Sequence, residues 1–436
     1  MGPRLTRDDC GRDWIWDRPV ETVTYADALA QAEAAWERQL RHLLDDSPFY
    51  VRKLRGAAKA RLWDLGQLPF TSKQELNDAL FEAPPFGSNA GVAPELVKRV
   101  YQTSGTSGTP SVIALSATDI ETWTAIGTRT YYATGIHDHH AVLSTFGAGP
   151  FVAGHTNFVL SRIGCRVVPV GPGDTERVLF AIRAGIVDTM LATPSFAQYL
   201  ANRPDASSGL LHVVTGGEPG GGIPAIRDHL ESSLGATVNE IMGIGDVSPS
   251  LFGECTFGQG MHFCGGGHVW PELVDPDDGS PVGIEPGAVG ELVYTHLTRE
   301  AMPVVRFRSG DVARVEGTSC DCGRTSFRIR CLGRRDDMFI VRGVNVYPSA
   351  VVAVVAAFRP RVTGRARVIR PGRDVTVEPP VEIEVEVPGE PADVTLAAQL
   401  EAEIRARLTF RAKVELVPEK AFGASVYKTR LTVSRT

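Results

Sequence analysis

The chain has 436 residues, of which 43% are hydrophobic and 22% are charged, and its formal net charge is -6. This length predicts two or three domains, and the composition is typical of a globular protein with a well-filled core. The sequence shows no basic stripe that would bind nucleic acid. No apolar run approaches the roughly 18 residues that a membrane-spanning helix needs.

The start of the chain and its cysteines favour a reducing compartment. Residues 1–14 are polar and lack the apolar core of a secretory signal. The seven cysteines are an odd number in a long chain, which disfavours a disulfide framework. We therefore expect a cytoplasmic protein whose partners include neither nucleic acid nor membrane.

The first elements expected along the chain are helices. Apolar residues recur at helical spacing among charges over residues 22–50. Residues 71–75, Thr-Ser-Lys-Gln-Glu, provide a cap and an early acidic residue, so a second helix is expected to start at Ser72. Residues 84–94 are rich in Gly, Pro and Asn and are expected to form a loop.

From residue 141 to residue 242, apolar runs alternate with helical patterns. The expected buried strands are 141–146, 165–170, 189–194, 209–215 and 236–242, with helices such as 174–185 and 223–234 between them. Alternation of strands and helices with short connections predicts a mostly parallel sheet that is covered on both faces.

The pattern changes twice towards the C-terminus. Turn signals separate short strands such as 291–297 and 304–307, which predicts an antiparallel β subdomain at about 255–333. Beyond residue 335 the expected elements are a helix at 349–358, strands at 365–370 and 381–387, a helix at 396–408 and a strand from residue 414.

The predicted fold class is therefore α/β. A large N-terminal domain, residues 1–334, combines mostly parallel sheets with the β subdomain. A small α+β C-terminal domain, residues 335–436, is expected to act as a mobile lid.

A loop rich in hydroxyls lies at residues 103–110, Thr-Ser-Gly-Thr-Ser-Gly-Thr-Pro. Its glycines free the backbone, so N–H groups and hydroxyls could wrap a polyphosphate. No Lys follows the second Gly, which excludes a Walker loop. Taken alone, the loop could equally be a surface linker.

Two glycine-rich turns follow predicted strands, at residues 216–219 and 242–246. Ligands of open parallel sheets bind beyond the carboxyl ends of strands. Asp246 in the second turn could hold Mg²⁺ through oxygen, although a helix N-cap would explain Asp246 as well. Glu218 in the first turn could also belong to an ordinary strand-to-helix connection.

Three further candidate functional residues or segments lie later in the chain. Asp311 follows a tight turn, where a carboxylate can accept both hydroxyls of a ribose. Residues 333–337, Gly-Arg-Arg-Asp-Asp, lie where the composition changes and form either a hinge or a solvated linker. Lys428 is a lone basic group near the C-terminus and, by itself, a surface lysine.

In this order, the motifs resemble those of the acyl-adenylate-forming (AMP-binding) enzyme superfamily, and within it the phenylacetate-CoA ligase branch. The resemblance covers roughly residues 30–430. The segments most similar to that branch are Ser47-Pro48-Phe49-Tyr50, Leu68-Pro69-Phe70-Thr71-Ser72-Lys73, Leu297-Thr298-Arg299-Glu300-Ala301-Met302-Pro303-Val304 and Cys322-Gly323-Arg324-Thr325.

The resemblance implies a role for each motif. The nucleotide would be bound at its β- and γ-phosphates by Thr103, Ser104, Gly105, Thr106, Ser107 and Gly108, at the adenine by Glu218 and Pro219, and at the ribose hydroxyls by Asp311. Arg334 would approach the ribose and the phosphate, and Gly217, Met242 and Gly243 would belong to the same nucleotide site. Asp246 would sit at the Mg²⁺ position and Asp336 at the hinge. Lys428 would bridge the carboxylate and the α-phosphate during adenylation.

The implied activity is ATP-dependent conversion of an aromatic carboxylic acid to an acyl-adenylate, with pyrophosphate release, and then thioester formation with coenzyme A. Lys428 and Mg²⁺ would stabilise the charge that develops at the α-phosphate, and a closing lid would exclude water. An amine or a carrier protein as acceptor, an unusual oxyanion as substrate, a non-catalytic nucleotide-binding role and a homodimer stay open.

The chain departs from the usual pattern of the family at four positions. Met242 stands where Tyr is common, Asp246 where Glu is common, Ser309 where Thr is common, and Tyr427 where Gly is common. Asp246 is one methylene shorter than Glu, so its contact with Mg²⁺ could run through water. These departures concern rate and substrate more than fold.

The acid pocket is expected at Phe146, Phe151, Gly154, His155 and Gly245, since an apolar wall with few polar groups suits an aryl acid. Plain core packing would explain the Phe residues, and a satisfied helix position would explain His155. His137, His139 and His140 have no carboxylate ligand pattern around them and are interpreted as a solvated turn.

A second metal site is expected at Cys255, His262, Cys320 and Cys322. Thiolates and an imidazole in a closed four-coordinate shell suit a structural Zn²⁺, and relatives share this Cys/His pattern. Cys331 or His268 could replace one of these ligands. The alternative is a set of buried free thiols, which is a frequent state of cysteine.

Overall fold

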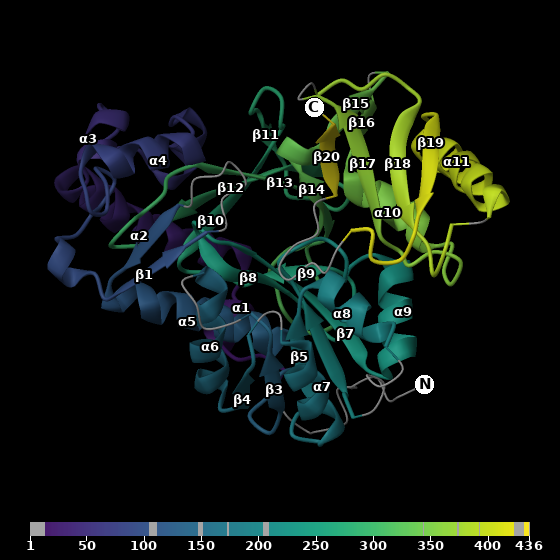
Figure 1. Cartoon of the computed structure of the whole chain (residues 1–436). Helices are drawn as coiled ribbons and strands as arrows, with labels where there is room; N and C mark the ends of the chain where they lie inside the picture. Colours follow the sequence, from purple (N-terminus) through teal and green to yellow (C-terminus); the bar gives the residue numbers. More distant parts are fainter. Residues whose placement is uncertain are drawn as a thin grey trace.

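The computed structural model describes residues 14–103, 111–146, 151–171, 174–203, 209–342, 344–372, 375–391, 393–422 and 431–435. The α/β class predicted from the sequence is confirmed (Figure 1). Within these residues, no helix has the length and apolarity needed to cross a membrane.

The N-terminal part is helical, with α1 (Arg18–Glu21), α2 (Tyr25–Asp46), α3 (Pro48–Lys53) and α4 (Lys73–Glu82). The expected helix over residues 22–50 divides at Ser47, because Pro48 disfavours helical backbone in the residue before it and opens α3. The predicted cap at Ser72 is confirmed, since Ser72 and Glu75 form a reciprocal capping box. Trp36, Leu40 and Leu43 of α2 are buried in the core beneath these helices.

A two-stranded sheet and a long sheet follow. β1 (Arg99–Gln102) pairs with β2 (Val112–Leu115). The five predicted strands are confirmed as β3 (Ala141–Ser144), β4 (Arg166–Pro169), β5 (Thr189–Ala192), β6 (His212–Thr215) and β7 (Thr237–Ile244), which are parallel in the order β4-β3-β5-β6-β7. The predicted burial of the second strand is wrong: β4 lies at the edge of the sheet, and its residues are exposed or half-buried. The helices among them are α5 (Ala117–Ala133), α6 (Thr156–Ile163), α7 (Thr175–Arg183), α8 (Pro194–Ala201) and α9 (Pro224–Leu234).

The antiparallel strands continue this sheet, because β7 is parallel to β6 and antiparallel to β8. They are β8 (Ser248–Glu254), β9 (Met261–Phe263), β10 (Val269–Val274), β11 (Pro281–Val282), β12 (Val289–His296), β13 (Phe307–Gly317) and β14 (Arg328–Arg334). The predicted strand over 304–307 is wrong: β13 begins at Phe307. Arg306 has a φ of 46°, in the left-handed region, which interrupts extended backbone before that point.

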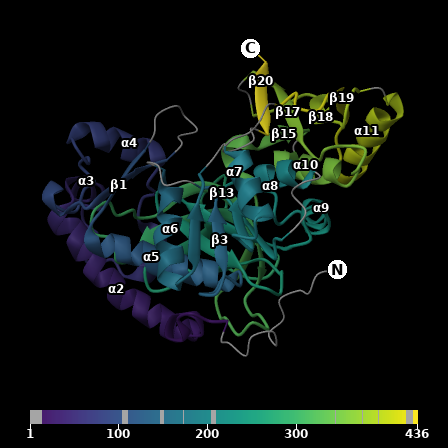
Figure 2. The ribbon, with the colours of Figure 1, turned by 60° about the horizontal axis from the view of Figure 1, so that its bottom comes forward.

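The C-terminal part forms its own four-stranded sheet, in the order β19-β18-β17-β20. Its elements are β15 (Phe339–Val341), β16 (Val344–Val346), α10 (Pro348–Ala356), β17 (Ala366–Pro371), β18 (Val381–Glu386), α11 (Val394–Leu408), β19 (Ala412–Val417) and β20 (Thr432–Arg435). It lies beside α8 and α9 in both views (Figures 1 and 2). Arg359 donates to the side-chain oxygen of Gln198 in α8 at 2.7 Å, which ties the two parts together.

Candidate active site

The turn after β7 brings a carboxylate to the end of the parallel strands. Asp246 is buried, and its Oδ2 lies 3.2 Å from Nζ of Lys73 at the start of α4. The same ammonium donates to Oγ1 of Thr103, 3.3 Å away. A Cβ at Gly243 would lie 1.8 Å from the carbonyl oxygen of Pro249, so only glycine allows the backbone to pass this closely.

Three segments that are distant in sequence meet at this turn. A Cβ on Gly245 would lie 2.8 Å from Cγ2 of Thr103 and 3.4 Å from Cγ2 of Val152. Phe151 forms an isolated β-bridge with Gln102, which holds the two segments of the chain side by side. The first residue of the hydroxyl-rich loop, the acidic turn and the expected acid pocket are therefore adjacent.

The Gly-Glu turn lies at the end of β6. Gly217 has a φ of 92°, which favours glycine, and Oε1 of Glu218 accepts from the backbone N–H of Ser195 at 2.8 Å. Ser195 belongs to the first turn of α8, where N–H groups lack partners within the helix. Glu218 and Pro219 are half-buried, so the turn keeps one side towards solvent.

A partly buried cluster of charged side chains holds the loop that follows this turn. Arg227 Nε donates to the carbonyl of Gly221 at 2.9 Å, and Arg330 Nη1 donates to that of Gly222 at 2.6 Å. Glu240 lies beneath them, where burial and the nearby Glu254 carboxylate raise its pKa to about 7. The cluster fixes the backbone between β6 and α9.

Asp311 and Arg334 lie opposite each other on β13 and β14. Arg334 Nη1 is 3.3 Å from Oδ1 of Asp311, and Nη2 is 3.0 Å from Oδ2 of Asp336. Burial acts to lower the pKa of Arg334, but Asp311 and Asp336 together raise it. One guanidinium thus joins the predicted ribose carboxylate to the predicted hinge.

The residues expected in the acid pocket differ in burial. Phe146 and Phe151 are half-buried, Gly154 is buried, and His155 is fully buried. His155 Nε2 lies 3.1 Å from Oγ1 of Thr124, and the ring packs edge-on against Tyr101 and Trp123. Burial, with help from Arg99 and Arg299, lowers the pKa of His155 to about 4, so the ring is neutral at pH 7.

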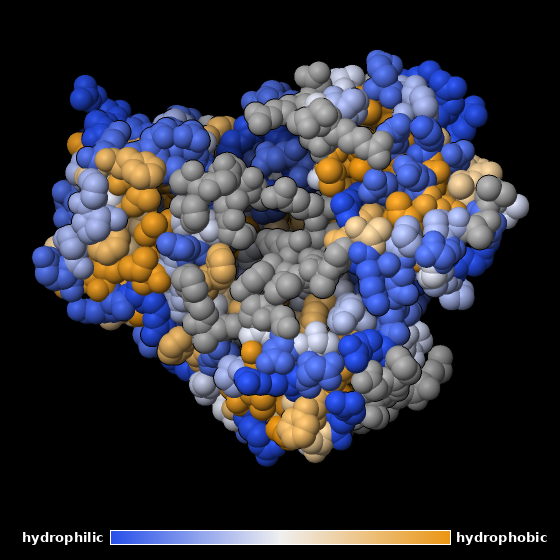
Figure 3. Space-filling view, in the orientation of Figure 1, coloured by the Kyte–Doolittle hydropathy of each residue, from blue (hydrophilic) through white to orange (hydrophobic). Residues whose placement is uncertain are grey.

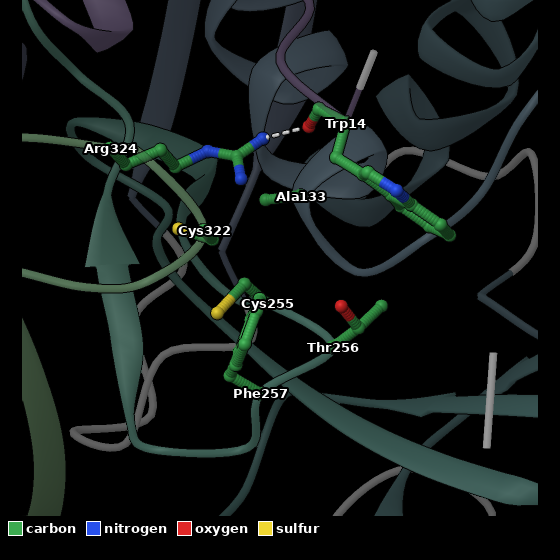
Figure 4. Close-up of a pocket in the computed structure, with 7 residues that line it drawn as sticks. All are labelled: Trp14, Ala133, Cys255, Thr256, Phe257, Cys322 and Arg324. Atoms are coloured by element: carbon green, nitrogen blue, oxygen red, sulfur yellow. Dashed lines mark hydrogen bonds between the residues drawn. The ribbon is translucent and has the colours of Figure 1, made fainter. Parts of the chain in front are cut away.

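The structure brings Cys255, His262, Cys320 and Cys322 together, with one ligand atom of each within 4.8 Å of all the others. The sulfurs of Cys255 and Cys320 are 3.7 Å apart, and Cys322 Sγ lies 3.4 Å from His262 Nε2. Figure 4 shows Cys255 and Cys322 next to Arg324, which donates to the carbonyl of Trp14. Among the described residues, His268 and Cys331 are not part of this cluster.

Some predicted residues fall outside the described ranges: Ser104, Gly105, Thr106, Ser107 and Gly108 of the hydroxyl-rich loop, and Lys428.

The face drawn in Figure 3 is hollowed between the N-terminal helices and the C-terminal part.

Two observations were not anticipated. Lys73 was recognised only as part of a branch motif, and its contact with Asp246 gave no signal in the sequence. The interpretation of residues 137–140 as a solvated turn is wrong for two histidines, since His137 and His140 are buried. Trp14 and Tyr132 pack against the ring of His137 and exclude water from it.

Comparison with known proteins found no matching family model. The chain is 34% identical to the phenylacetate-coenzyme A ligase of Thermus thermophilus over 394 residues, or 86% of this chain and 85% of that one. It is 34% identical to the phenylacetate-coenzyme A ligase of Escherichia coli over 356 residues, or 78% of each chain.

A solved structure of 2-hydroxyisobutyryl-CoA ligase with 2-HIB-AMP, in the postadenylation state, superposes with a TM-score of 0.87 at 24% identity. The same enzyme with 2-HIB-AMP and CoA, in the thioesterification state, gives 0.69 at 25% identity. Both alignments cover 100% of this chain and 95% of the other chain.

Proposed function

This chain belongs to the phenylacetate-CoA ligase family, and from that membership we propose that it activates an aromatic carboxylic acid with ATP and transfers the acyl group to coenzyme A. The first step releases pyrophosphate and leaves an acyl-adenylate. The thiol of coenzyme A then displaces AMP and forms the thioester.

The observation that carries the proposal is the meeting of Thr103, Gly245 and Asp246 at one point of the fold. In a family that forms acyl-adenylates, this point suits the reacting phosphate and carboxylate. Asp311 and Arg334 are already paired on neighbouring strands, which suits a ribose. Glu218 at the end of β6 lies where open parallel sheets bind ligands, which suits the adenine.

Lys73 adds a cation that the sequence did not assign to this reaction. Its ammonium contacts both Asp246 and Thr103. We assign Lys73 to the phosphates, because a point charge with three N–H donors can hold oxyanions from several directions. Lys428 supplies the second cation and bridges the acid and the α-phosphate in the adenylation step.

Asp246 fits a magnesium site because it offers carboxylate oxygens beside the start of the hydroxyl-rich loop. The ion would share its charge between Asp246 and phosphate oxygens and would offset the negative charge of ATP. Among the described residues, Asp246 would hold the magnesium ion. The ammonium of Lys73 would then leave Asp246 and contact the nucleotide.

The four-residue cluster fits zinc on geometry. Tetrahedral zinc with three Cys and one His places its sulfurs about 3.8 Å apart and each sulfur about 3.6 Å from the nitrogen. The Cys255–Cys320 and Cys322–His262 separations in the structure, 3.7 and 3.4 Å, are close to these values. Zinc here would join β8 and β9 to residues 320–322 and would take no part in the reaction.

The arrangement of the two parts suits the adenylation half of the cycle. The chain superposes better on the postadenylation state of a structural neighbour than on its thioesterification state. We propose that the C-terminal part turns about Asp336 between the two steps. The Arg359–Gln198 hydrogen bond would form in the first arrangement and break in the second.

The function is tested with purified protein, Mg-ATP and a panel of phenylacetate, benzoate and 2-hydroxyisobutyrate. Pyrophosphate release should require an aryl acid, and addition of coenzyme A should give equal amounts of AMP and aryl-CoA. Replacing coenzyme A with amines tests the alternative acceptor. Release of ADP, or no pyrophosphate with any aryl acid, would contradict the proposal.

A further inference from the structure

Arg324 is a buried cation that lies between the four-residue cluster and the N-terminal segment, residues 14–23. The arginine is only 3% exposed. Its Nε donates to Oε2 of Glu21 at 2.6 Å, and its Nη2 donates to the carbonyl of Trp14 at 2.5 Å. Two of the three guanidinium nitrogens therefore hold the N-terminal segment.

The third nitrogen, Nη1, is buried and has no oxygen or nitrogen acceptor among the described residues. The sulfur of Cys322 attracts the guanidinium of Arg324 both by its charge and as a hydrogen-bond acceptor. Arg324 and Cys322 also line one small cavity, together with Trp14 and Cys255 (Figure 4). Nη1 is therefore the donor that Arg324 has left for a thiolate of the cluster.

A tight turn brings Arg324 back towards the cysteines that precede it. Gly323 has a φ of 87°, in the left-handed region that favours glycine, and its N–H donates to the carbonyl of Cys320 at 3.0 Å. The N-terminal segment packs on this turn, since a Cβ at Gly323 would lie 3.5 Å from Cδ1 of Ile15. The turn that carries two of the metal ligands is thus also the surface that the segment covers.

The histidine of the cluster is oriented by the same stretch of chain. His262 Nδ1 lies 3.3 Å from the carbonyl oxygen of Ser326, which can only accept. The proton of the ring is therefore on Nδ1, and Nε2, 3.4 Å from Sγ of Cys322, is free to bind a metal. Histidines that bind metals commonly donate their other N–H to such a carbonyl. Residues 320–326 hence supply ligands together with the groups that orient them.

Two further contacts fasten the N-terminal segment to this stretch. The N–H of Thr325 donates to the carbonyl of Glu21 at 3.0 Å, and its hydroxyl donates to the carbonyl of Val23 at 2.7 Å. Oε1 of Glu21 accepts from the N–H of Asp17 at 2.8 Å, while Oε2 is held by Arg324. Movement of residues 320–326 would therefore be passed directly to the segment.

We propose that Arg324 is a positioning residue of the zinc site, with Nη1 donating to the metal-bound sulfur of Cys322. Three thiolates and a neutral imidazole leave one net negative charge around Zn²⁺, and a buried charge without a partner is strongly unfavourable. The guanidinium offsets this charge. Because it also holds Glu21 and Trp14, metal binding fastens the N-terminal segment. This role depends on the proposed zinc site and is independent of the ligase reaction.

Zinc affinity tests the charge of Arg324. Competition with a chromophoric chelator should give a zinc dissociation constant about 10- to 100-fold higher for Arg324→Met than for the unaltered protein. Arg324→Lys retains the charge and should recover most of this loss, whereas Arg314→Met, at an exposed position of β13, should bind zinc as the unaltered protein does. Equal affinity in Arg324→Met would overturn the role of Arg324 and leave the zinc site standing. No zinc in the unaltered protein would overturn both.

Cobalt in place of zinc distinguishes a hydrogen bond to sulfur from a general effect on stability. The sulfur-to-cobalt charge-transfer band should shift to longer wavelength in Arg324→Met, because a thiolate without its N–H donor gives up electron density more easily. Glu21→Gln removes the ion pair with Arg324 but leaves Nη1 in place, so its band should stay where it is in the unaltered protein. An unshifted band in Arg324→Met would exclude the hydrogen bond.

Hydrogen exchange on the unaltered protein tests the link to the N-terminal segment and needs no variant. Removal of zinc by a chelator should speed exchange in a peptide that spans residues 14–24, with little change in a peptide from α11. An unchanged 14–24 peptide, or an equal rise in both peptides, would show that the metal does not fasten this segment.

Discussion

The ammonium of Lys73 lies 3.2 Å from a carboxylate oxygen of Asp246, although 173 positions separate the two residues. The pair joins the N-terminal helices to the turn at the end of the parallel strands. It also places a cation and an anion beside Thr103, where the hydroxyl-rich loop begins. This pairing of a cation with an anion suits the proposed binding of a polyphosphate and its metal ion at this point.

Replacing Lys73 with Met should lower the rate of pyrophosphate release about 10- to 100-fold, because a charge-assisted contact to phosphate oxygens is lost. Lys53→Met is the matched control, since Lys53 pairs with Glu75 in the same helical region. The measurement is steady-state pyrophosphate release at saturating acid. Equal losses in the two variants would show that Lys73 acts only on the stability of this region.

Lys428→Ala should reduce adenylation far more than thioester formation from supplied acyl-adenylate. The reason is that Lys428 is assigned to the carboxylate and α-phosphate, which react only in the first step. Single-turnover assays of each half-reaction make the comparison, with the exposed Lys413→Ala as the control. Similar losses in both half-reactions would refute the assignment.

The Cys₃His cluster should bind one zinc per chain, as measured by elemental analysis of purified protein. Cys322→Ser should lose the metal and lower Tm, because the ligands then hold β8 and residues 320–322 together less firmly. Cys165→Ser is the control, since Cys165 is a free cysteine near His137 and outside the cluster. Protein without zinc and with full stability would contradict the assignment.

Glu240 should make the folded protein less stable as the pH rises. Its pKa is raised from 4.5 to about 7 by burial and by Glu254, with Arg227 and Arg330 opposing, so the folded state retains a proton that the unfolded chain releases. The free energy of unfolding that this retained proton contributes is fully present below pH 4.5 and is lost as the pH rises through 7.

The expected loss between pH 5.5 and 8.5 is about 2 kcal/mol of unfolding free energy. Urea unfolding at the two pH values measures it. Glu240→Gln should remove this part of the pH dependence, whereas the exposed Glu95→Gln should retain it. The same pH dependence in all three proteins would show that Glu240 is ionised in the fold.

Much of the fold could be predicted because its strands are short apolar runs between clear helical patterns. β3, β5 and β6 are buried along their whole length, so a continuous apolar run marks each of them. The start of β13 was missed because Arg306, in a left-handed conformation, is bound by Glu272 and by the carbonyl of Leu68. Such long-range contacts leave no local pattern.

The candidate site was predictable in part for the same reason. Ordered motifs indicated Asp246, Asp311 and the Cys/His set, since each has a recognisable local sequence. Lys73 lies in a motif of no obvious chemistry, and only the packing of the folded chain brings a carboxylate, Asp246, next to it. Sequence alone could not distinguish a solvated His137 from one covered by Trp14.

The most direct measurement is a crystal structure with a non-hydrolysable analogue of an aryl acyl-adenylate. We expect the ribose hydroxyls on Asp311, the adenine beside Gly217 and Glu218, and the phosphate between Thr103 and Lys73. An analogue bound elsewhere, with Asp311 and Asp246 remote from it, would contradict the account.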